Sequence, residues 1–130
     1  MAQNQLIICD TNIIIELLKD NKEIKNTCLN IGYNKLSISP ITSAEMYFGA
    51  FDKKEMAKID KFLQKFAILP LKEEISSIFA ELMKKYCLSH KPFIGDMLIA
   101  ATDLHHEIEI YTLNVKDFQF IPNLRLYQPA

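Results

Sequence analysis

The chain has 130 residues, 49% of them hydrophobic, so one domain with a sizeable core is expected over residues 1–130. The 15 basic and 16 acidic residues give a formal net charge of −1, which excludes the strongly basic surface of a typical duplex-DNA binder. Neither a signal peptide nor a membrane-spanning segment is predicted. The three cysteines, Cys9, Cys28 and Cys87, have no metal-ligand spacing, so we expect them to be buried free thiols in a soluble cytoplasmic protein.

The first third of the chain alternates short apolar runs with helical patterns. Residues 6–9 form a continuous apolar run, which is typical of a strand buried on both faces. Helices are predicted over residues 13–19 and 22–31, and a second strand over residues 36–39.

A helix after residue 39 is predicted from its capping residues, because Ser39 suits an N-cap and Pro40 suits the first helical turn. Its predicted apolar face consists of Ile41, Ala44, Phe48 and Phe51. The clearest amphipathic helix follows over residues 55–66. One of its faces carries Ile59, Phe62, Leu63 and Phe66, and the other carries Lys54, Lys58, Lys61 and Lys65.

The second half of the chain repeats this alternation. A strand over residues 67–69 precedes a long helix over residues 73–87, and residues 95–105 form a helix that is apolar nearly all round. The last two strands are predicted over residues 108–112 and 125–127. Strands that alternate with helices predict an α/β protein with three layers, α/β/α, around a parallel sheet of four to five strands.

Four acidic residues, Asp10, Glu45, Asp96 and Asp117, recur after predicted strands or at the start of the buried helix. Ligands of open parallel sheets bind beyond the carboxyl ends of the strands, so this architecture can gather the four acids in one crevice. Asp96 is the only charge in its apolar segment, and a lone buried carboxylate is costly unless it is neutralised or paired. We therefore predict that the four acids hold a hard divalent cation, Mg²⁺ or Mn²⁺.

Each acid also has a structural explanation. Asp10 and Asp96 could each cap a helix, and Asp117 could be a turn residue. Residues 42–45 match the capping-box pattern, so Glu45 could be a cap partner. The agreement of position, residue type and neighbours in all four favours the metal site.

Four segments of the chain resemble the PIN-domain nucleases, and in particular the VapC-type toxins of toxin–antitoxin pairs. In family order they are Ile8–Leu18, Ser39–Met46, Asp96–Ala101 and Thr112–Phe118. The glycine before Asp96 departs mildly from the family pattern.

The resemblance implies a PIN fold, Mg²⁺-dependent cleavage of RNA, a homodimer and inhibition by a small antitoxin. Carried over residue by residue, it places the four acids at the acidic positions of the family. It also implies that the neighbouring polar residues orient the acids; these are Thr11, Asn12, Thr112 and Asn114.

Two other classes of protein remain open at this point. A phosphoaspartate protein, either a receiver domain or a Mg²⁺-dependent phosphatase, also has an Asp after its first strand, but Asn12 stands where the phosphatase requires a second Asp. A non-catalytic binding module on the same fold would not need the four acids. The lysine face of residues 54–65 is interpreted as a solvated surface, with contact to RNA phosphates as an alternative. His105 and His106 are interpreted as cationic residues at a helix end, without a catalytic role. The aromatic residues are interpreted as core, with base stacking by Tyr47 or Phe93 as an alternative.

Overall fold

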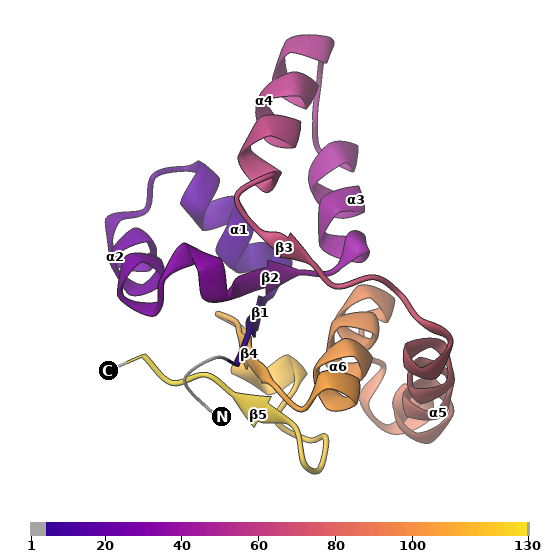
Figure 1. Ribbon diagram of the computed structural model, residues 1–130. Coiled ribbons are helices and arrows are strands. Elements are labelled where there is room, and N and C mark those ends of the chain that lie inside the picture. Colours follow the sequence, from indigo (N-terminus) through magenta and orange to yellow (C-terminus); the bar gives the residue numbers. More distant parts are fainter. Residues whose placement is uncertain (1–4, 130) are drawn as a thin grey trace.

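A computed structural model describes residues 5–129 of the chain, and its centre is a sheet of five parallel strands (Figure 1). β1 is the middle strand, because the spatial order is β3-β2-β1-β4-β5. In register, Ile8 of β1 lies opposite Ser37 of β2 and opposite Ile110 of β4. The predicted parallel sheet is confirmed, and its strands are β1 (Ile7–Cys9), β2 (Leu36–Ile38), β3 (Ala67–Ile68), β4 (Glu109–Tyr111) and β5 (Arg125–Leu126).

Helices connect the strands and cover both faces of the sheet. Within residues 5–129 the α-helices are α1 (Thr11–Leu18), α2 (Lys22–Ile31), α3 (Pro40–Phe48), α4 (Lys53–Leu63), α5 (Glu73–His90) and α6 (Ile94–His106). Short 3₁₀ turns cover Tyr33–Lys35 and Val115–Asp117. The helices agree with the predicted ones to within a few residues, and none in this described part is long and apolar enough to cross a bilayer.

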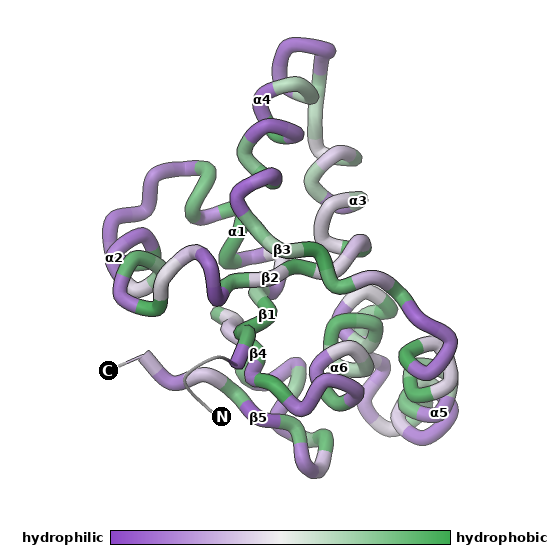
Figure 2. The backbone as a smooth tube through the Cα atoms, in the orientation of Figure 1, coloured by the Kyte–Doolittle hydropathy of each residue, from purple (hydrophilic) through white to green (hydrophobic). Residues whose placement is uncertain are grey.

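The alternation of side chains along β1 separates two hydrophobic cores. Ile7 and Cys9 point to the core under α1, α2, α3 and α4, whereas Ile8 points to the core under α5 and α6. In Figure 2, β1 and α6 are coloured hydrophobic, and much of α2 and α4 is hydrophilic. The two cores on opposite faces of one sheet confirm the predicted three-layer α/β/α architecture.

The prediction of an apolar core face containing Phe48 and Phe51 is wrong. Phe48 is 93% exposed and Phe51 is 80% exposed. α3 buries Thr42 and Met46 instead, and Phe48 is turned about 200° from Met46 around the helix axis. Because α3 ends at Phe48, Phe51 lies beyond the helix and does not continue its face.

The amphipathic prediction for α4 is confirmed. Ile59 and Leu63 are buried, as is Phe66 just after the helix. The predicted lysine face is exposed along its whole length, which agrees with a solvated surface.

The cysteine prediction is confirmed for two of the three residues. Cys9 and Cys28 are fully buried free thiols, and burial raises the pKa of Cys28 to about 11. Cys87 is exposed, because α5 turns its neighbour Tyr86 toward the core.

Candidate active site

Asp10 directly follows β1, the central strand, and is the N-cap residue of α1. One carboxylate oxygen accepts a hydrogen bond from the Thr11 backbone N–H (2.7 Å), and the other accepts one from the Thr112 hydroxyl (2.7 Å). The side chain is only 5% exposed. Burial raises the pKa of Asp10, while these two hydrogen bonds lower it and the charges of Glu45 and Asp117 raise it further. Asp10 therefore caps a helix and also supplies a carboxylate with a fixed orientation.

Thr112, just after β4, is the residue that holds Asp10 in place. Its hydroxyl oxygen accepts the Asn114 backbone N–H (3.0 Å) and the Asn12 side-chain amide (3.4 Å). With its lone pairs occupied, the hydroxyl directs its single proton to Asp10. The Asn12 amide oxygen in turn accepts the Leu113 backbone N–H (3.3 Å), so α1 and the segment after β4 are joined around the carboxylate.

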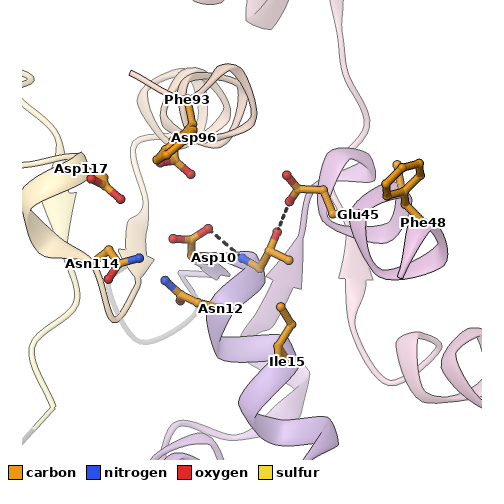
Figure 3. A pocket seen from close by; sticks show the side chains of 11 residues that line it. Asp10, Asn12, Ile15, Glu45, Phe48, Phe93, Asp96, Asn114 and Asp117 are labelled. Carbon is orange, nitrogen blue, oxygen red and sulfur yellow. Dashed lines mark hydrogen bonds between the residues drawn. The ribbon is translucent and has the colours of Figure 1, made fainter. Parts of the chain in front are cut away.

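Glu45 extends from α3 toward α1 (Figure 3). Its carboxylate accepts a hydrogen bond from the Thr11 hydroxyl at 2.5 Å, and the Thr11 and Thr42 hydroxyl oxygens lie 3.0 Å apart. The capping-box alternative for Glu45 is wrong, because the N-cap of α3 is Ser39.

Gly95 gives the Glu45 carboxylate room beside α6. A Cβ atom at residue 95 would lie 2.9 Å from Glu45 Oε2 and 3.6 Å from a side-chain carbon of Ile41. The first distance is shorter than a van der Waals contact, so any side chain at this position would displace the carboxylate. Gly95, which departs from the family pattern, therefore leaves the space that the Glu45 carboxylate occupies.

Asp96 and Asp117 complete the group of four acids. Asp96 lies in the first turn of α6, whose N-cap is Phe93, so the capping alternative for Asp96 is wrong. Asp117 ends the 3₁₀ turn after β4, and both acids are half-buried. Burial, followed by the charges of Asp10, Asp117 and Glu45, raises the pKa of Asp96 to about 7.

The four acids open onto one cleft of about 610 Å³ (Figure 3). The structure therefore brings together all four predicted acids. Of the predicted polar residues, Thr11, Asn12 and Asn114 line the cleft, and Thr112 is buried behind Asp10. The remaining lining residues are Ile15, Ala44, Phe48 and Phe93. None of them was among the predicted acids and polar residues, although Phe93 was named as an alternative for base stacking. Phe48 could have been predicted as a lining residue from the sequence, because it follows Glu45 by three residues and so lies on the same face of the helix.

The chemistry of the cleft is that of an oxygen-donor site. Within residues 5–129, no cluster of three or more His, Cys, Asp or Glu side chains is already close enough to bind one metal ion. The charges of neighbouring carboxylates nevertheless raise the pKa values of Asp10 and Asp96, which places the acids within electrostatic reach of one another. A divalent cation in such a group would offset the repulsion between the carboxylates.

Comparisons with known proteins match this fold and cleft. The sequence model of the PIN domain matches residues 7–120. Ribonuclease VapC1 of Rickettsia felis is 34% identical over 130 residues, covering 92% of this chain and 93% of that protein. A toxin–antitoxin complex from Klebsiella pneumoniae contains a chain of similar structure, with 30% identity, a TM-score of 0.77, and coverage of 95% and 98%. A chain of VapBC2 from Rickettsia felis, bound to a promoter DNA fragment, has 25% identity, a TM-score of 0.79, and the same coverage.

The chain therefore belongs to the PIN-domain family. Within this family its relatives are VapC ribonucleases, as the sequence resemblance predicted. Family membership favours the nuclease interpretation over the phosphoaspartate alternatives.

Proposed function

We propose that the protein is a metal-dependent endoribonuclease that hydrolyses RNA phosphodiester bonds, with Mg²⁺ as cofactor and Mn²⁺ as a substitute. The observation that carries the proposal is the cleft in which Asp10, Glu45, Asp96 and Asp117 converge. The ribonuclease names of the related VapC proteins support the choice of RNA as substrate.

The residues of the cleft fit a hard divalent cation in their chemistry. The four acids offer carboxylate oxygens, which Mg²⁺ and Mn²⁺ prefer. Among residues 5–129, no His or Cys that would select a softer metal lines the cleft. Asp10 and Asp96 would be the principal ligands, with Glu45 and Asp117 binding directly or through water. When bound, the cation would activate a water, bind the scissile phosphate and stabilise the leaving oxygen.

The chain's own residues keep the acids in position for that cation. Thr112 and the Thr11 backbone fix both oxygens of Asp10, and the Thr11 hydroxyl fixes Glu45. Asn12 and the Asn114 backbone act one step further out, by orienting Thr112. Such supporting hydrogen bonds commonly affect metal affinity or activity by about 10- to 100-fold.

We further propose that this nuclease is the toxin of a type II toxin–antitoxin pair in the cytoplasm, that it forms a homodimer, and that a small antitoxin inhibits it. The toxin–antitoxin complexes among the similar structures support the antitoxin partner. Sedimentation of the purified chain tests the dimer. Co-expression with the product of a short neighbouring gene tests the antitoxin, and we expect it to restore the growth of cells that produce the wild-type chain.

The decisive test of the nuclease is cleavage of RNA by the purified chain with and without Mg²⁺. We expect Asp10→Asn and Asp96→Asn to reduce cleavage to background. The melting temperature of Asp96→Asn without metal should be unchanged or higher, because the substitution removes a charge from a repelling group. Asp10→Asn should melt lower but remain folded, because its amide replaces one of the two oxygens that accept hydrogen bonds. Asp103→Asn is the matched control, because Asp103 is as buried as Asp10 but lies outside the cleft. Full activity of either cleft variant would remove that residue from the mechanism.

A further inference from the structure

Two aromatic side chains line the acidic cleft and are unusually exposed. Phe48 is 93% exposed and Phe93 is 71% exposed. Single exposed apolar residues are common on protein surfaces, but these two open onto the same cleft as the four acids. In Figure 3, Phe48 lies on the α3 side of the cleft and Phe93 on the α6 side.

Each ring is paired in sequence with one acid of the cleft. Phe48 follows Glu45 by three residues on α3, and Phe93 precedes Asp96 by three residues at the start of α6. On α3 this spacing puts Phe48 and Glu45 on the same face of the helix, and Phe93 and Asp96 line the cleft from the N-cap and the first turn of α6. The cleft therefore presents two similar units, each with a carboxylate and an aromatic ring beside it.

A lysine lies close in sequence on two of the segments that form the cleft. Lys91 is two residues before Phe93, and Lys116 directly precedes Asp117. Both are exposed, and among the described residues 5–129 neither forms an ion pair with a carboxylate. The two lysines do not line the cleft, so they would meet only phosphates outside it, whereas the aromatic rings that line the cleft match the bases of a nucleic acid strand.

We propose that Phe48 and Phe93 stack on the bases on either side of the scissile phosphate of an unpaired RNA substrate. The proposal deepens the nuclease function proposed above and rests on it. A base inside a duplex is already stacked on both faces and paired, and it cannot meet a protein ring without leaving the helix. An unpaired base can lie against a phenylalanine while its phosphate reaches the acids.

The first experiment measures kcat and KM of the full-length protein with Mg²⁺ on one RNA sequence, as a single strand and annealed to its complement. We expect the single strand to be cut and the duplex to be resistant. Phe48→Ala and Phe93→Ala should each lower kcat/KM on the single strand roughly 5- to 100-fold, mainly through KM. Tyrosine at either position should restore most of the loss, because the ring is retained.

Phe51→Ala is the matched control. Phe51 is the same residue type, is 80% exposed and lies three residues from Phe48, but it does not line the cleft. We expect this variant to cut RNA like the wild type.

The second experiment uses RNA that lacks a single base next to the mapped cleavage site. Removal of the stacked base should weaken the wild type about as much as Phe48→Ala or Phe93→Ala does. On the RNA that lacks this base, the alanine variant whose ring would have stacked there should lose little further activity. The base removal and the ring removal then form a double-mutant cycle, which isolates the contact that they share.

The outcomes separate the two proposals. If the wild type cuts no RNA of either form, the nuclease function fails. If it cuts RNA but both alanine variants keep kcat/KM within about twofold of the wild type, the stacking proposal fails alone. The stacking proposal also fails if duplex RNA is cut as well as the single strand. It fails too if the variants lose only the binding of an antitoxin while their RNA cleavage is unchanged.

Discussion

One buried aspartate lies at the carboxyl ends of the strands, called here the carboxyl edge of the sheet, and another lies near their amino ends, the amino edge. The two side chains have very different surroundings. At the carboxyl edge, Asp10 has both oxygens hydrogen-bonded and faces a cleft with three other acids. At the amino edge, Asp103 of α6 is 1% exposed, and among the described residues its Oδ1 has no hydrogen-bond partner. Asp103 lines a separate pocket of about 610 Å³ with Arg125 and Glu107.

The comparison shows that a raised pKa does not by itself mark a functional acid. Burial raises the pKa of Asp103 to about 8, although the Arg125 backbone N–H and charge lower it. The pKa of Asp96, raised to about 7, also reflects three neighbouring carboxylates. What distinguishes the carboxyl edge is the convergence of several like charges, which a cation can relieve, whereas the raised pKa of Asp103 comes mainly from burial, beside the positive charge of Arg125.

The largest expected difference between the two edges is in the pH dependence of stability. Because the folded-state pKa of Asp103 is raised above its ordinary value of 3.8, the folded protein retains a proton that the unfolded chain releases. Its contribution to stability is complete below about pH 4 and is lost as pH rises to about 8. Asp103→Asn should therefore be more stable than wild type at pH 9 by roughly 3–6 kcal/mol, because each unit of pKa shift corresponds to about 1.4 kcal/mol. At pH 4 the two should be nearly equal.

Denaturant unfolding at pH 4, 6 and 9 measures this difference. The free energy of unfolding of the wild type relative to Asp103→Asn should decline across the series. A difference that does not change with pH would mean that Asp103 is ionised in the folded protein, and the contrast with Asp10 would disappear.

The next effect tests the hydrogen bond that Asp10 has and Asp103 Oδ1 lacks. Thr112→Val removes the hydroxyl that donates to Asp10, and we expect a loss of about 1–3 kcal/mol in the free energy of unfolding. RNA cleavage should fall as well, since the carboxylate loses its fixed orientation. Thr102→Val is the control, because the buried Thr102 hydroxyl donates to the Leu98 carbonyl within α6 and has no other hydrogen-bond partner in the described part of the chain. Equal effects of both valines on cleavage would deny Thr112 a special role.

The smallest expected change in stability comes from Gly95→Ala. Alanine is favoured over glycine within a helix by about 1 kcal/mol, and the group it meets, Glu45 Oε2, is the end of a flexible side chain. We expect the melting temperature to be maintained while cleavage falls about tenfold, because Glu45 must leave its place beside Thr11. Gly49→Ala is the control, since its Cβ would meet only ordinary contacts at 3.6 Å and beyond. Unchanged cleavage by Gly95→Ala would show that the position of Glu45 does not matter.

The sequence predicted the features that depend on periodicity and strand ends. The apolar run of β1 and the acid directly after it were enough to place Asp10 at the carboxyl edge, and the same logic placed Asp117. The capping residues Ser39 and Pro40 located the start of α3, as the structure confirms. These features are local, so a single sequence carries them.

The features that the sequence did not predict depend on contacts between distant segments. An apolar residue near the end of a helix does not reveal whether its face meets the core, and Phe48 was assigned to the wrong side for that reason. The burial of Asp103 depends on β4 and β5, and the need for Gly95 depends on Glu45, which lies 50 residues earlier. Tertiary packing decides such positions.

The bond between Thr112 and Asp10 joins residues 102 positions apart, and this has a consequence for synthesis of the protein. A growing chain carries Asp10 before the hydroxyl that orients it, because Thr112 is added 102 residues later. We expect chains interrupted between the two residues to leave the Asp10 carboxylate without its Thr112 hydrogen bond.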